Sequence, residues 1–100
     1  MVQFNNLDPL LHSQLRLAVI SFLLSVKEAE FVYIREKTNS TAGNLSVQID
    51  KLSSAGYIEV EKSFKNRRPL TMCRITKKGI GAFEEYVKNL QKYINIDKSK

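Results

Sequence analysis

The sequence predicts a mainly α-helical domain of the α+β class, with the order helix, helix, helix, strand, strand, helix. Apolar residues recur at helical spacing in three stretches before residue 57 and in one stretch after residue 76. Between them, two short segments alternate apolar and polar side chains on either side of a basic turn, as in a hairpin with one buried face. A length of 100 residues with 43% hydrophobic content suits one domain, which we take as residues 1–100.

The first helix is predicted over residues 7–26, because Asp8 and Pro9 are typical of a helix start. One apolar stripe on it consists of Leu11, Leu15, Ala18 and Phe22. A second apolar row, about 120° around the helix, consists of Leu10, Leu17 and Leu24. A small monomer needs only one such face. The second row therefore predicts cover by the terminal helix or by a partner subunit.

Residues 30–54 predict two helices joined by a turn. The first of them is short and has Phe31 and Ile34 three residues apart. Residues 38–40 are polar and can supply the N-cap of the second helix. The buried side of the second helix is marked by Ala42, Leu45, Ile49 and Leu52. Gly56 is expected just past the helix end, where the backbone often needs a positive φ.

Residues 57–76 predict the hairpin. Ile58 and Val60 alternate with glutamates in the first strand, and the alternation in the second strand turns Cys73 inward. Cys73 is therefore predicted to be a small buried hydrophobe, with a redox-sensing thiol as the alternative. Thr76 can cap a last helix over residues 77–95. The apolar stripe of that helix consists of Ile80, Phe83, Val87, Leu90 and Ile94, widened by Tyr86 and Tyr93.

Positive charge is concentrated in the hairpin. Residues 62–78 contain seven cationic side chains and no acid, although the net charge of the whole chain is only +6. Clustered charge of this kind attracts polyanions, so the candidate partner is nucleic acid or an acidic protein. The predicted tip of the hairpin is formed by Lys65, Asn66, Arg67 and Arg68.

These segments together resemble the winged helix-turn-helix transcriptional regulators of the broad MarR/ArsR-like group. The resemblance is strongest over TAGNLSVQIDKLSSAGYIEVEKSFKNRRPLTMCRITKKGIGAFEEY, which is similar to a recognition helix, its exit, a wing and the entry to a last helix. The stretch HSQLRLAVISFLL resembles the family's first helix. The resemblance implies a winged helix that binds double-stranded DNA, and dimerisation through the first and last helices.

A recognition helix must present short polar groups opposite its buried side, and residues 41–51 do so. Asn44 and Gln48 are predicted to contact bases, because their carboxamides can pair with adenine in the major groove. Phosphate contacts are predicted for Ser40, Thr41, Ser46 and Lys51. The wing tip, formed by Lys65, Asn66, Arg67 and Arg68, is predicted to lie on the DNA backbone or the minor groove, where its arginines could enter the groove and pair with phosphates. The dimer interface is predicted at Leu10, Leu17, Leu24, Tyr86, Leu90, Tyr93 and Ile94.

Other classes of function are disfavoured. A single histidine, His12, and a single cysteine offer no metal cage, so the chain departs from the metal-sensing ArsR pattern and we expect no cofactor. No catalytic set or glycine-rich phosphate loop is present in the sequence, which predicts a protein that is not an enzyme. The chain has neither an apolar stretch of about 18 residues nor a basic signal-like start, so a cytoplasmic protein is expected.

Two alternatives remain open at this stage. A winged helix can also bind protein, with the basic hairpin docked on an acidic partner and the last helix as the main contact. RNA is a lesser candidate, because the basic segment lacks the set of aromatic side chains on which unpaired bases stack. The sequence does not indicate whether a small-molecule effector acts on the protein.

Overall fold

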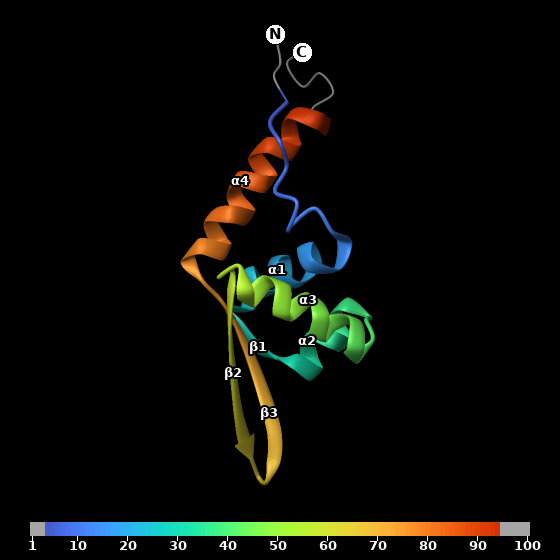
Figure 1. The fold of residues 1–100 in the computed structure, drawn as a ribbon, viewed down its shortest axis with the longest axis vertical. Coiled ribbons are helices and arrows are strands. Elements are labelled where there is room, and N and C mark those ends of the chain that lie inside the picture. The colour runs from blue at the N-terminus through green and yellow to red at the C-terminus, as the bar shows by residue number, and fades with distance from the viewer. Residues whose placement is uncertain (1–3, 95–100) are drawn as a thin grey trace.

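The computed structural model describes residues 4–94, so residue 95 of the predicted last helix lies outside the described part. The elements are α1 (Gln14–Val26), β1 (Glu28–Glu30), α2 (Phe31–Thr38), α3 (Ala42–Ser54), β2 (Ile58–Lys65), β3 (Arg68–Ile75) and α4 (Lys77–Ile94). Figure 1 shows α1 to α3 gathered in one cluster, from which the β2–β3 hairpin and α4 project in opposite directions. The predicted fold class, mainly α-helical with a small hairpin, is confirmed. Within residues 4–94, no helix is long and apolar enough to span a bilayer.

The first helix begins later than predicted, at Gln14 rather than at residue 7. Asp8 does cap a helical turn, since its carboxylate accepts the Leu10 N–H at 2.9 Å. That turn does not continue, because the backbone of Ser13 is extended, with φ −153° and ψ 129°. The Leu10 carbonyl accepts a hydrogen bond from Arg16 Nε at 2.6 Å. The segment before Gln14 is therefore a separate capped turn that packs beside α1.

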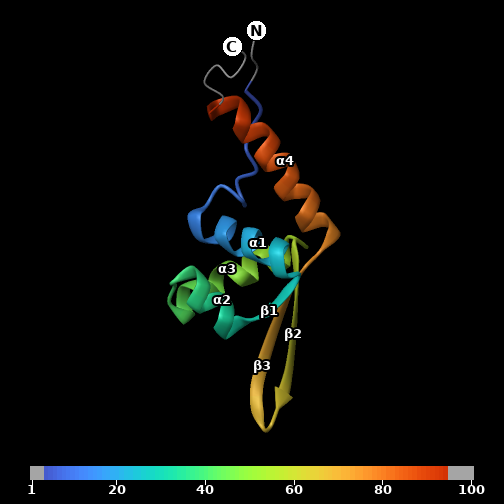
Figure 2. The ribbon, with the colours of Figure 1, turned by 180° about the vertical axis from the view of Figure 1, so that it is seen from behind.

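The structure contains a third strand that the sequence analysis did not predict. β1 pairs antiparallel with β3, which gives the sheet order β1-β3-β2. β1 has only three residues, and Ala29 alone is buried, opposite Cys73. A pattern this short carries no periodic signal. The strand exists because the edge of β3 lies beside it, as the view in Figure 2 also shows.

The turn between α2 and α3 is closed by different residues from those predicted. The N-cap of α3 is Thr41, whose hydroxyl accepts the Asn44 N–H at 3.1 Å. Thr38, one of the predicted caps, instead donates its hydroxyl to the Ile34 carbonyl at 2.8 Å and so belongs to the end of α2. Asn39 has a φ of 53°, a left-handed conformation that ends α2. The chain can then reverse direction within three residues.

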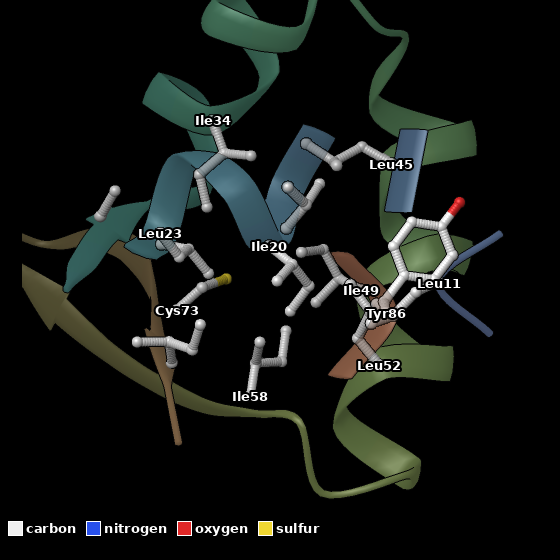
Figure 3. Close-up of a cluster of buried hydrophobic side chains, with 13 residues drawn as sticks. Leu11, Ile20, Leu23, Ile34, Leu45, Ile49, Leu52, Ile58, Cys73 and Tyr86 are labelled. Atoms are coloured by element: carbon white, nitrogen blue, oxygen red, sulfur yellow. The ribbon is translucent and has the colours of Figure 1, made fainter. Parts of the chain in front are cut away.

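The hydrophobic core lies where the three-helix cluster meets the sheet (Figure 3). Its labelled members are Leu11, Ile20, Leu23, Ile34, Leu45, Ile49, Leu52, Ile58, Cys73 and Tyr86. The buried side of α3 is therefore as predicted, except that Ala42 is exposed. Cys73 is fully buried, and this burial raises the pKa of its thiol to about 11. The thiol stays protonated at neutral pH, which agrees with its prediction as a small hydrophobe.

The base of α4 packs directly against the backbone at the end of α3. Gly56 has the predicted positive φ, at 83°. The Thr76 hydroxyl lies 2.7 Å from the Gly56 carbonyl oxygen and 3.0 Å from that of Tyr57, and it accepts the Gly79 N–H at 3.0 Å. A Cβ on Gly79 would lie 2.2 Å from the Tyr57 carbonyl oxygen. Only glycine allows α4 to approach this closely.

Candidate nucleic-acid interface

The exposed face of α3 carries short side chains. Leu45, Ile49 and Leu52 anchor the opposite side in the core. Val47 lies about 200° around the helix from Leu45 and is 50% exposed, so it occupies the middle of the open face. One turn earlier, a Cβ on Gly43 would have no described heavy atom within 4 Å. Because neither residue extends far, the helix backbone can approach a flat surface or a groove closely.

The predicted contact residues of α3 lie on two sides of this face. Asn44 and Gln48 border a hollow of about 500 Å³ that lies between α3 and the start of α1, and Ser40 and Thr41 line the same hollow. Ser46 instead borders the groove between α3 and the hairpin. Asn44, Ser46 and Lys51 are exposed and Gln48 is half-buried. Thr41 and Ser40 are already hydrogen-bonded within the chain, to the Asn44 N–H and to the Thr38 hydroxyl.

Gln48 is held by two neighbours. Its carboxamide oxygen accepts a hydrogen bond from Arg16 Nη1. Its Nε2 donates to Asn44 Oδ1 at 3.0 Å. The contact of Arg16 with Gln48 could not be predicted from the sequence, because it joins two helices 32 positions apart along the chain. A row of three side chains therefore runs from α1 to the exposed face of α3.

The tip of the hairpin is tighter than the predicted turn. β2 and β3 remain paired as far as Lys65 and Arg68, so the turn consists of Asn66 and Arg67 alone. Both have positive φ, 54° and 65°, as a type I′ turn requires. Asparagine tolerates this conformation, whereas arginine in place of the usual glycine costs roughly 1 kcal/mol. All four predicted tip residues are exposed. The chain thus carries a cationic side chain where the backbone favours glycine.

Lys62 and Phe64 of β2 also belong to the candidate interface, although they were not among the predicted contact residues. They lie on the same face of β2 as the buried Ile58, since alternate residues of a strand share a face. Lys62 borders the groove between α3 and the hairpin, together with Ser46. Phe64 is 76% exposed and lies opposite Pro69, near the tip. The period of two beginning at Ile58 would have placed both side chains there.

Arg74, one of the seven cations of residues 62–78, does not extend the basic surface. Its guanidinium lies 2.9 Å from the carboxylate of Glu28, 3.4 Å from that of Glu61 and 3.6 Å from that of Glu59. The hydrogen bonds that Arg74 donates to Glu28 and to Glu61, the Glu28 bond first, raise the pKa of Arg74. The base of the hairpin is therefore acidic on its outer face. Among the described residues, the hairpin cations that make no ion pair lie toward its tip.

The comparison with known families decides what this arrangement is. Residues 15–94 match the family model described as a winged helix DNA-binding domain. The chain belongs to this family. The β2–β3 hairpin is its wing and α3 is the second helix of its helix-turn-helix, and the resemblance predicted from the sequence is confirmed. The family is one of DNA-binding domains and not of enzymes, as the sequence also predicted.

Known proteins similar to this winged helix come from archaea and bacteria. An uncharacterized protein of Methanocaldococcus jannaschii is 37% identical over 76 residues, which cover 76% of this chain and 83% of the relative. A solved structure, the transcriptional regulator homologue protein from Pyrococcus horikoshii OT3, is 29% identical with a TM-score of 0.80 and covers 86% of this chain and 85% of that one. The structure of mutant MarR from E. coli, complexed with operator DNA, matches with a TM-score of 0.69 at 18% identity. The match covers 88% of this chain and 68% of the MarR chain. The likeness to MarR is one of fold.

The predicted dimer residues of the winged helix differ in exposure. Leu10, Leu17, Leu24 and Leu90 are half-buried against the core of their own chain. Tyr86 is only 4% exposed, and its hydroxyl lies 2.9 Å from His12 Nδ1, so it belongs to that core. Tyr93 and Ile94 are exposed at the far end of α4. Phe4 packs on Tyr93 with ring centroids 4.9 Å apart and adds to the apolar surface there.

Proposed function

We propose that this winged helix is a sequence-specific transcriptional regulator of double-stranded DNA that acts as a homodimer. In this proposal α3 enters the major groove and the wing contacts the backbone or the minor groove. The observation that carries it is the combination of a recognition helix with short exposed side chains and a projecting hairpin whose exposed tip is cationic (Figure 1). The family itself is one of DNA-binding domains, and the similar Pyrococcus protein is described as a transcriptional regulator homologue.

The chemistry of each part suits its role. Val47, in the middle of the exposed face of α3, offers an apolar contact for a thymine methyl group. Lys62 and the exposed tip cations, Arg67 among them, suit phosphate oxygens, which fix the position of a protein on DNA without reading sequence. Phe64 near the tip has the character of an apolar wedge at a minor groove.

A titration of one sequence in two forms tests the proposal. Fluorescence anisotropy would compare a labelled duplex with each of its separated strands at the same salt concentration. Because α3 needs a major groove, the duplex is expected to bind at least about tenfold more tightly than either strand. Equal or tighter binding of a single strand would contradict the proposal and would favour a stacking role for Phe64.

The homodimer is proposed through the far end of α4. The supporting observation is an exposed apolar surface formed by Phe4, Tyr93 and Ile94, at the end of the molecule away from the wing. A dimer formed there would carry two recognition helices. Two such helices that read successive major grooves lie about 34 Å apart, and the matching DNA site is an inverted repeat.

Ile94→Glu is expected to convert the dimer into a monomer, because it places a charge in the proposed apolar contact. Sedimentation velocity at high micromolar concentration would measure the change. Val32→Glu is a matched control, since Val32 on α2 has the same exposure as Ile94, 59%. The control should sediment as wild type does. A wild-type protein that remains monomeric at this concentration, or an equal effect of the two substitutions, would refute this interface.

The alternative of a protein-binding winged helix uses the same wing. An acidic partner would meet the cations at the tip, and α4 would make the main contact. Capture of that partner by the purified protein would then persist after nuclease treatment. Loss of capture on nuclease treatment would favour DNA.

A further inference from the structure

The contacts of Gln48 fix the direction of the hydrogen bonds on the exposed face of α3. Arginine has donors only, so the side of the Gln48 carboxamide that faces Arg16 must be its oxygen. The Gln48 amide group then points to Asn44, and because it is a donor it must meet the Asn44 oxygen. No alternative orientation of either carboxamide keeps both bonds.

The outer end of this row is Asn44. Among residues 4–94 its Nδ2 has no acceptor and so keeps both donor hydrogens, and its Oδ1 keeps one of two lone pairs after the bond from Gln48. At the major-groove edge of adenine, N7 accepts a hydrogen bond and the N6 amino group donates one. Guanine presents two acceptors there, of which O6 would face the Asn44 oxygen and repel it. Asn44 therefore has the free groups that adenine requires.

Gln48 is less suited to read a base itself. It lies about 60° around the helix from Leu45 at the core, whereas Asn44 lies about 100° away. Gln48 is half-buried, and both ends of its carboxamide are engaged within the chain. Its bond from the Arg16 guanidinium is charge-assisted and correspondingly strong. Arg16 is itself held by the Leu10 carbonyl at 2.6 Å.

We propose that Arg16 and Gln48 are positioning residues that hold the Asn44 carboxamide toward an adenine in the major groove. This inference rests on the proposed sequence-specific binding of duplex DNA. It departs from the sequence-based prediction that Gln48 also contacts a base. Gln48 and Asn44 then govern the same base position in the recognised site, and not two neighbouring positions.

A binding selection tests the proposal. A pool of duplexes with a randomised central segment would be bound by the wild-type protein, and the enriched sequences would be read. The same pool would be used with Asn44→Ala, with Gln48→Leu, which removes both hydrogen bonds at similar size, and with Gln48→Glu. Lys51→Gln is the control. Loss of an exposed lysine that contacts a phosphate is expected to lower the affinity for all sequences alike. Thermal unfolding of each variant checks that it is folded.

Asn44→Ala and Gln48→Leu are expected to reduce the preference for adenine at one and the same position. In the wild-type protein the preference for adenine should lie in the range of about 5- to 150-fold that a bidentate pair gives. In these two variants it should approach equality among the four bases. In Gln48→Glu the carboxylate still accepts from Arg16 but cannot donate, so it draws the Asn44 amide group toward itself and the adenine preference is lost at that position too.

Two results would count against this account in different ways. A wild-type protein that enriches a site, while Gln48→Leu loses a different position from Asn44→Ala or loses none, overturns the positioning role and leaves DNA recognition intact. A wild-type protein that enriches no sequence overturns the proposed function, and the positioning role with it.

Discussion

Gly79→Ala is expected to lower the melting temperature by more than about 10 °C. The new Cβ would lie 2.2 Å from the Tyr57 carbonyl oxygen, which also accepts hydrogen bonds from the backbone and side chain of Thr76. This carbonyl cannot move away without breaking those bonds. Overpacking against a fixed group costs about 3 kcal/mol, and 1 kcal/mol corresponds to roughly 4–8 °C in a domain of this size. Circular dichroism during heating would measure the change.

Gly81→Ala supplies the matched control two residues further along α4. No described heavy atom lies within 4 Å of a Cβ at Gly81. Alanine there should raise the stability by about 1 kcal/mol, since it favours the helix and meets no obstacle. If the two substitutions had effects of the same sign and size, the close approach of α4 to the end of α3 would be wrong.

The double substitution Arg67→Gln with Arg68→Gln is expected to weaken binding to every duplex on the order of 50-fold near 0.1 M salt. Each lost phosphate contact removes about 0.9 from the slope of log affinity against log salt, so the slope should become less steep by roughly 2. The preference among sequences should not change, because tip contacts to phosphates do not read bases. Anisotropy titrations at several salt concentrations would give both quantities.

Arg67→Gly separates the charge at the wing tip from its fold. The position has a φ of 65°, so glycine relieves backbone strain while it removes one cation. We expect an affinity loss of about 8-fold near 0.1 M salt, with a melting temperature equal to or above that of wild type. A loss of affinity that appeared only in variants with lowered melting temperature would mean that the tip acts through folding.

Strong periodic signals in the sequence predicted most of the fold. The apolar spacing of Leu45, Ile49 and Leu52 predicted which side of α3 is buried, and Gly56 predicted where it ends. The predicted start of α1 was wrong because Asp8 caps a separate turn, which ends at the extended backbone of Ser13, and apolar spacing does not reveal such a break. β1 was missed because its pairing with β3 comes from tertiary contact and not from its own three residues.

The candidate site was less predictable than the fold. Exposed short residues on α3 and cations at the wing tip follow from composition and period alone. The link from Arg16 to Gln48 does not, since it depends on how α1 crosses α3. The neutralisation of Arg74 could not be predicted from the sequence either, because the three carboxylates that surround Arg74 come from two different strands. Contacts between elements decide which charges remain free for a partner.

The most direct test of DNA binding is the salt dependence of wild-type affinity for a duplex of random sequence. The unpaired cations toward the wing tip and on α3 predict several phosphate contacts per complex, and hence a slope of roughly minus five or steeper. Binding that is undetectable near 50 mM salt, or that does not change with salt, would contradict the assignment of this surface to DNA and would favour an acidic protein partner.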